Sequence, residues 1–153
     1  MATLNFCLKR RSSERGAELI EFALVMPLLL LLVLGIVDFG FLFQRFEVVT
    51  NAAREGARLA VLGGYSTDDV KGRVNDYLEE GGVPITRGTN PDIQVLSTSI
   101  DLTGGKTVGG KQVQVRYFHN YLFLGGVLSW FGGSFSSVPL TGVSTMRIEG
   151  SGS

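Results

Sequence analysis

Residues 15–37 read RGAELIEFALVMPLLLLLVLGIV, and this stretch decides the fold. It contains a glycine, Gly16, followed five residues later by a glutamate, Glu21, and no charged residue occurs from Phe22 to Val37. A carboxylate is costly in hydrocarbon unless it has a partner or a function. We therefore interpret the stretch as a membrane helix that carries a functional acid where it enters the bilayer.

The length of the uncharged run supports a membrane span. As α-helix, Phe22 to Val37 covers about 24 Å, slightly less than a hydrocarbon core of ~30 Å. Extension to Phe43 gives about 33 Å and includes Asp38, so we expect a span over about residues 20–43. Pro27 is tolerated as a kink in lipid. A cleaved secretory signal is the alternative, but no convincing small-x-small cleavage site follows the run.

Charge is distributed unevenly along the chain. The first sixteen residues hold four basic side chains and one acid, a net charge of +3, so the rest of the chain carries −3. This excess before the apolar run predicts a cytoplasmic N-terminus and a single pass through the membrane. A mildly acidic exported part argues against nucleic acid as a partner. The one cysteine, Cys7, lies in the basic leader.

Beyond Phe43 the apolar pattern becomes amphipathic without a turn signal, and Gly63-Gly64 is the first clear stop. We expect one helix over 17–62. The positions expected on its apolar face are Leu42, Phe46, Val49, Ala53, Ala57 and Ala60. Small residues from Ala52 to Ala60 permit close packing, either within the chain's own domain or against other subunits.

Residues 64–153 predict a small α+β domain. A capping box at Ser66–Asp69 predicts a short helix over 67–80. Patterns rich in β-branched residues predict an antiparallel sheet of about three strands. The expected strands are 92–102, 112–124 and 138–149, with 103–111 as a long hairpin loop. Segment 123–135 is apolar and glycine-rich, which fits either a loop or short helix covering the core or an exposed patch for a partner subunit or the membrane.

The sequence predicts no enzyme, cofactor or metal site. His119 is the one histidine, and no sequence motif places a nucleophile or carboxylate beside it. Gly105–Lys111 resembles part of a P-loop, but Gln112 replaces the required Ser or Thr and a strand follows, so we expect no nucleotide. The acids of the short helix lack the spacing of a calcium loop.

Several blocks in order give the chain a resemblance to a known family. They are Gly16-Ala-Glu-Leu-Ile-Glu21-Phe22, Ala23-Leu-Val-Met-Pro27, Gly35-Ile-Val-Asp38-Phe39-Gly40 and Ala52-Ala-Arg54-Glu55-Gly56-Ala-Arg58. With them the chain resembles the TadE-like family, pilin-related proteins of the tight-adherence (Tad/Flp) pilus system. The resemblance is strongest over Arg15–Leu62 and resumes weakly at 144–149. It implies a minor pilin or pseudopilin of a Tad (type IVb-like) pilus, in the bacterial inner membrane or the extracellular pilus.

The resemblance also implies how the chain is processed and assembled. A prepilin peptidase would cut the leader, 1–16, between Gly16 and Ala17, and Glu21 would become the fifth mature residue. Its carboxylate would then offset the amino terminus of a neighbouring subunit. Ala17 stands where many type IV pilins have a methylated phenylalanine, so methylation is not implied. The expected partners are the peptidase, other pilin-like subunits, pilus assembly proteins and the lipid bilayer.

The other charged residues of the matched blocks are candidates for helix packing or pairing. We expect Asp38 to pair with Arg45, one heptad along, or with a neighbouring helix. Arg54 and Arg58 are expected to bind carboxylates of the sheet domain or of another subunit, and Glu55 lies between them. Two other functions remain open: a membrane-anchored scaffold that never enters a filament, and a secreted enzyme or adhesin with an ordinary signal peptide.

Overall fold

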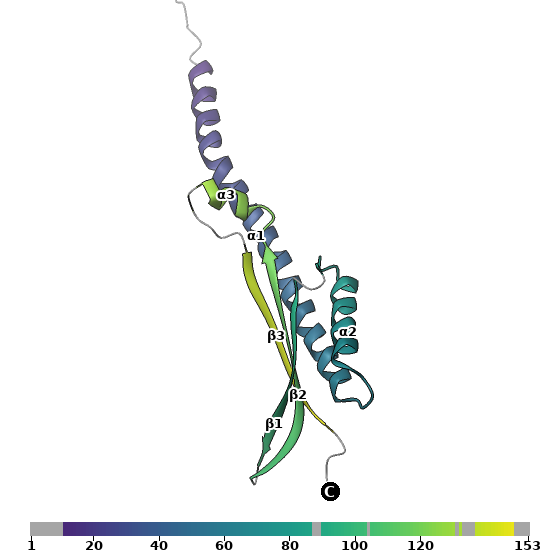
Figure 1. The fold of residues 1–153 in the computed structure, drawn as a ribbon. Coiled ribbons are helices and arrows are strands. Elements are labelled where there is room, and N and C mark those ends of the chain that lie inside the picture. Colours follow the sequence, from purple (N-terminus) through teal and green to yellow (C-terminus); the bar gives the residue numbers. More distant parts are fainter. Residues whose placement is uncertain (1–10, 87–89, 104, 131, 133–136, 149–153) are drawn as a thin grey trace, which may run out of the picture. The chain divides into compact units, whose positions relative to one another are not determined.

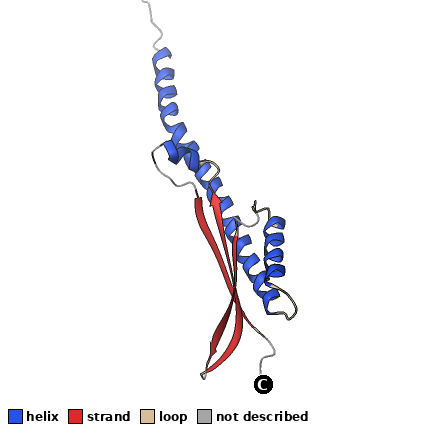
Figure 2. Ribbon diagram, in the orientation of Figure 1, coloured by secondary structure: helices blue, strands red, loops and turns tan. Residues whose placement is uncertain are grey.

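The computed structural model describes residues 11–86, 90–103, 105–130, 132 and 137–148. Figure 1 shows the order of the elements and Figure 2 separates helices from strands. The elements are α1 (Arg11–Val61), α2 (Thr67–Glu80), β1 (Asp92–Leu102), β2 (Lys106–Asn120), α3 (Leu124–Trp130) and β3 (Ser137–Arg147). The sheet is antiparallel in the order β1-β2-β3. The predicted α+β class, with a long helix, a short helix and three strands, is confirmed.

The chain divides into two compact units, Met1–Val37 and Asp38–Ser153. In the first unit α1 runs through Pro27, and its large apolar side chains are exposed. It starts at Arg11, six residues before the predicted start, because no proline interrupts 11–16 and Gly16 alone costs a helix only about 1 kcal/mol. One helix of the described residues is long and apolar enough to cross a membrane, and its most apolar window has a mean hydropathy of 2.7.

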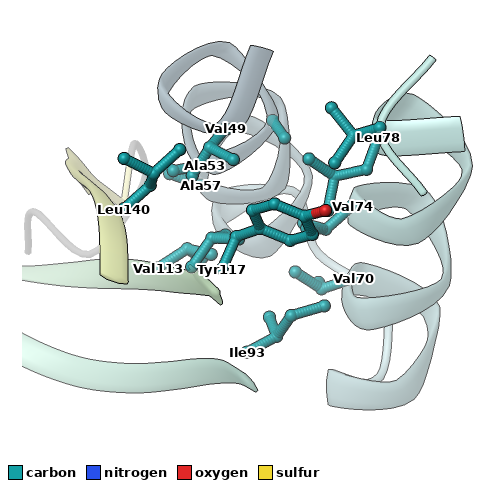
Figure 3. Close-up of a cluster of buried hydrophobic side chains, with 13 residues drawn as sticks. Val49, Ala53, Ala57, Val70, Val74, Leu78, Ile93, Val113, Tyr117 and Leu140 are labelled. Atoms are coloured by element: carbon teal, nitrogen blue, oxygen red, sulfur yellow. The ribbon is translucent and has the colours of Figure 1, made fainter. Parts of the chain in front are cut away.

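The second unit has one hydrophobic core, made by α1, α2 and the sheet together (Figure 3). Helix α1 contributes Val49, Ala52, Ala53 and Ala57, and the predicted stripe of α2 contributes Val70, Val74 and Leu78. The sheet adds Ile93, Val113, Val115, Tyr117 and Leu140. Of the predicted α1 face, Leu42 and Ala60 are partly buried against this core, whereas Phe46 remains 46% exposed.

Two glycines permit the closest approaches in this core. A Cβ on Gly56 of α1 would lie 2.6 Å from Val74 Cγ2 of α2. A Cβ on Gly142 of β3 would lie 2.7 Å from the carbonyl oxygen of Val49 in α1. Real Cβ contacts are longer than this, so the missing side chains let α1 pack directly on both neighbours. The small residues of the outer half of α1 therefore pack within their own unit.

Helix α2 begins with the predicted capping box. The Ser66 hydroxyl accepts a hydrogen bond from the Asp69 amide at 3.2 Å, and the Asp69 carboxylate accepts one from the Ser66 amide at 2.8 Å. Both bonds satisfy amide groups that the first helical turn leaves free. The pKa of Asp69 is lowered, first by the Ser66 hydroxyl and then by the Ser66 amide.

Two predictions about the sheet region were wrong in detail. The glycine-rich segment 103–111 is not a long loop, because β2 already starts at Lys106 and pairs with β1 from Leu102↔Lys106 onward. Glycines can join a β-ladder, because the ladder hydrogen bonds are made by the backbone. At position 110 a larger residue would be too close to β1, since its Cβ would lie 2.8 Å from Ile100 Cδ1. At its other end β2 stops at Asn120, four residues before the predicted end, and α3 follows.

Candidate functional site

The expected processing and assembly residues all lie on α1 in the first unit. Gly16, Ala17 and Glu21 are helical, Gly16 is partly exposed, and both Ala17 and Glu21 are exposed. Apart from its own helix backbone, a Cβ on Gly16 would meet no atom of the described residues within 4 Å. Leu19, Ile20 and Phe22, around Glu21, are each more than 60% exposed. The carboxylate is thus presented on an apolar helix surface that a bilayer or neighbouring helices would cover. The leader residues 1–10 lie outside the described part of the chain.

Asp38 is fully buried in the second unit, and its carboxylate binds a distant segment. Its Oδ1 accepts a hydrogen bond from the Leu122 amide at 3.1 Å, and its Oδ2 accepts bonds from the amides of Phe123 at 3.0 Å and Leu124 at 2.7 Å. These amides lie just before and at the start of α3, where the helix itself supplies no acceptors. A carboxylate also interacts favourably with the positive end of a helix. Asp38 therefore caps α3 from another element.

Arg45 lies two turns further along α1 and binds the sheet. Its Nη1 donates to Nδ1 of His119 on β2 at 2.7 Å. Because a guanidinium only donates, Nδ1 must be the acceptor, which leaves the ring proton on Nε2. His119 is fully buried, and its Nε2 has no hydrogen-bond partner among the described residues. The Tyr121 ring packs edge-on against it, with centroids 5.6 Å apart.

The surroundings keep His119 neutral. Burial lowers its pKa most, and the positive charge of Arg45 lowers it further, while the carboxylate of Asp38 acts in the opposite direction. An uncharged imidazole can accept the Arg45 proton at Nδ1, whereas an imidazolium cannot. Asp38, Arg45 and His119, which we name the anchor cluster, thus join α1 to β2 and to α3. The arrangement holds the backbone of residues 122–124 and the end of β2 against α1.

An open depression of about 490 Å³ borders the anchor cluster. Its lining is mostly polar or aromatic, and includes Arg45, Thr86, Asn90, Asn120 and Tyr121. Asn90 already binds β2, since its side-chain Nδ2 donates to the Phe118 carbonyl at 3.1 Å and its side-chain Oδ1 accepts from the Phe118 backbone amide at 2.9 Å. Among the described residues, no three His, Cys, Asp or Glu side chains gather as a metal site.

Arg54, Glu55 and Arg58 form contacts on the outer half of α1. Arg58 donates to both carboxylate oxygens of Glu55, at 3.0 and 2.9 Å, and Arg54 donates to the side chain of Asn51 at 3.2 Å. Arg73 of α2 also reaches Glu55, at 3.5 Å. Chiefly through the hydrogen bond from Arg58, the pKa of Glu55 is lowered. Glu55 thus links α1 to α2, whereas Arg54 and Arg58 are exposed.

The predicted residues fall into two groups in the structure. His119 and the backbone amides of 122–124 are added to the group that contains Asp38 and Arg45. Gly16, Ala17 and Glu21 belong to the first unit, and Asp38 and Arg45 belong to the second. The binding partners of Asp38 and Arg45 were missed, because His119 and the amides of 122–124 lie more than seventy residues along the chain. The one available signal was Asp38 itself, an acid that follows directly on an uncharged run.

Comparison with known proteins relates part of the chain to a family. A family model described as TadE-like protein matches residues 16–58. No significant match was found among curated proteins or among solved structures. The matched range starts at Gly16 and includes Glu21, Asp38, Arg45 and the Arg54–Arg58 segment. The resemblance to the TadE-like family is therefore confirmed over residues 16–58, which contain the predicted membrane span and the part of α1 that packs in the second unit.

Proposed function

We propose that this chain is a pilin-like structural subunit of a Tad pilus, made as a precursor and cut by a prepilin peptidase between Gly16 and Ala17. The observation that carries the proposal is the TadE-like match, which begins at Gly16 and continues through the whole apolar run. The chain has the parts that such a subunit needs: an apolar helix for storage in the membrane, and a folded unit for contacts outside it.

The cut and the assembly step use different residues of the same helix. Gly16 presents a peptide bond without a side chain, behind a basic leader that favours the cytoplasmic side. Cleavage creates a charged amino group on Ala17 at the membrane surface. Glu21 carries the opposite charge on an apolar surface, where an unpaired carboxylate is unfavourable. Pairing of Glu21 with the amino terminus of a neighbouring subunit removes both unpaired charges.

The assembly role is tested by Glu21→Ala in cells that make the pilus. Glu18→Ala is the matched control, because Glu18 is another exposed acid on the same helix, three residues away. We expect Glu21→Ala to be cleaved normally but to be reduced at least tenfold in sheared pili, since its neighbour's amino group would lack a partner, while Glu18→Ala enters normally. Immunoblots of membrane and pilus fractions measure this.

Two outcomes would contradict the proposal. If Glu21→Ala enters pili as well as the native chain, Glu21 has no assembly role. If the native chain itself is found in membranes and never in pili, the anchored-scaffold function replaces the pilin function.

A further inference from the structure

The depth of Asp38 fixes the position of the segment that it binds. Asp38 follows directly on an uncharged run whose sixteen residues cover about 24 Å as helix, less than the ~30 Å of a hydrocarbon core. A span that starts at Phe22 therefore continues past Asp38. The amides of Leu122, Phe123 and Leu124 lie within 2.7–3.1 Å of the Asp38 carboxylate, so this segment must share its depth.

The second unit exposes large apolar side chains around this point. On α1 they are Phe39, Phe41, Phe43 and Phe46, which are 39–68% exposed. Leu122 is 56% exposed and Phe123 42% exposed on the connection before α3. These side chains belong to the two stretches that Asp38 joins, and lipid is the solvent that makes their exposure favourable.

The charge pattern separates this part of the unit from the rest. From Tyr117 to Met146, thirty residues contain no Asp, Glu, Lys or Arg. Helix α2, in contrast, has seven charged residues among its fourteen, as expected for a surface in water. The backbone amides of Leu122, Phe123 and Leu124, just before and at the start of α3, have Asp38 as acceptor and do not need water. In lipid every backbone amide needs such a partner.

We propose that Tyr121–Trp130, the interfacial segment, lies in the membrane leaflet next to the folded unit, at the level of the headgroups and upper acyl chains. The partner is the lipid itself. Asp38 holds the segment against α1, Leu122 and Phe123 contact acyl chains, and Tyr121 lies at the interface, where tyrosine is enriched in membrane proteins. This inference goes beyond the proposed function, since it requires neither leader cleavage nor entry into a filament.

Site-directed spin labelling of the full chain in lipid nanodiscs tests the proposal. Cys7→Ser removes the one natural cysteine, and single cysteines then replace Leu122 and, as a second position, Phe123. Leu96→Cys and Leu102→Cys on β1, outside the uncharged residues 117–146, are matched controls, because these side chains are 44% and 38% exposed. Leu31→Cys, within the apolar run, is the reference for a lipid-exposed label.

The readout is the relaxation of each label by oxygen, which concentrates in hydrocarbon, and by a water-soluble nickel chelate. We expect the oxygen-to-nickel ratio at 122 and 123 to lie below that at 31, which is deeper in the bilayer, and to exceed the controls about threefold or more, because water is excluded from hydrocarbon. A ratio equal to the controls would place the segment in water and overturn the proposal. Labels shielded from both reagents would indicate a neighbouring protein copy, which also overturns it.

A label-free measurement guards against disturbance by the substitutions. Trp130 is the one tryptophan of the chain, at the end of α3. In nanodiscs of lipids brominated at different depths, we expect its fluorescence to be quenched more by shallow bromines than by deep ones. Absence of quenching at every depth would contradict the proposal.

Discussion

Asp38 shows how one buried carboxylate connects parts of the chain that lie far apart in sequence. Its three hydrogen-bond partners are 84–86 residues along the chain, and they are backbone amides, whose position no side-chain pattern reveals. A carboxylate that accepts several amide bonds can be buried without a cation, since its lone pairs are satisfied. The acid in the apolar sequence is thus explained by backbone capping rather than by an ion pair.

Loss of this carboxylate should free the start of α3. In Asp38→Ala the amides of 122–124 lose charge-assisted bonds worth about 1.5–3 kcal/mol each. We expect their hydrogen exchange to accelerate at least tenfold, because about 1.4 kcal/mol corresponds to a factor of ten. Asp101→Ala, at an exposed position of β1, is the control and should leave these rates unchanged. Unchanged exchange in Asp38→Ala would show that other groups hold the segment.

His119 should make the second unit sensitive to mild acid. Burial and Arg45 lower its folded-state pKa, so below the unfolded value of about 6.5 the unfolded chain binds a proton that the folded chain resists. The free energy of unfolding should fall as the pH drops from 7 to 5, by at most about 1.4 kcal/mol per pH unit. Glu55 and Asp69, whose pKa values are also lowered, act only in more acidic solution.

The pH effect is measured by urea unfolding of the full chain in micelles. His119→Gln keeps an acceptor for Arg45 but does not titrate, so its unfolding free energy should be nearly constant over this range. An equal pH dependence in the native chain and in His119→Gln would assign the effect to another group.

At the scale of the elements, the contact between α1 and α2 depends on a missing side chain. Gly56→Ala would gain up to about 1 kcal/mol of helix propensity, but its Cβ would lie 2.6 Å from Val74 Cγ2 and 3.2 Å from Val113 Cγ1. Adding a methyl group against a stiff valine side chain typically costs about 1–3 kcal/mol. We therefore expect Gly56→Ala to lower the free energy of unfolding.

Gly72→Ala in α2 is the matched control for this prediction. A Cβ there meets nothing within 4 Å, so the variant should gain about 0.5–1 kcal/mol from helix propensity alone. Urea unfolding of both variants provides the comparison. Stabilisation of both to the same extent would show that the packing at Gly56 is loose.

Most of the elements follow from the sequence, and the exceptions have physical reasons. The long helix, the capping box and the stripe of α2 are local patterns, and each was predicted within a few residues. The start of β2 was missed because the glycines at 109 and 110 suggest a loop, whereas their strand state depends on pairing with β1 and β3. Segment 123–135 was left open between two interpretations, and residues 131 and 133–135 lie outside the described part.

The candidate site was predicted to a different extent in its two parts. Gly16 and Glu21 form a local motif, so their presence in the TadE-like match could be expected from sequence. The anchor cluster depends on the sheet that brings His119 to Arg45, and that contact joins residues 74 positions apart. Spacing along α1 could relate Asp38 to Arg45, but it could not relate either residue to the sheet or to residues 122–124.

The whole molecule consists of a helix suited to the membrane and a folded unit built on the same helix. The first unit presents Glu21 and an exposed apolar surface, and the second encloses the outer half of α1 in its own core. This division leaves the membrane half available for other subunits while the folded half is already packed. Such a chain is suited to storage in a bilayer followed by assembly.

Mass spectrometry of the mature N-terminus shows whether the chain is processed as a prepilin. The chain is expressed in cells with the Tad prepilin peptidase and purified from membranes, with a peptidase-deficient strain as control. We expect a mature chain that starts at Ala17 in the first strain and a chain that retains residues 1–16 in the control. A chain that starts at Met1 in both strains, or one that starts near residue 40, would contradict prepilin processing.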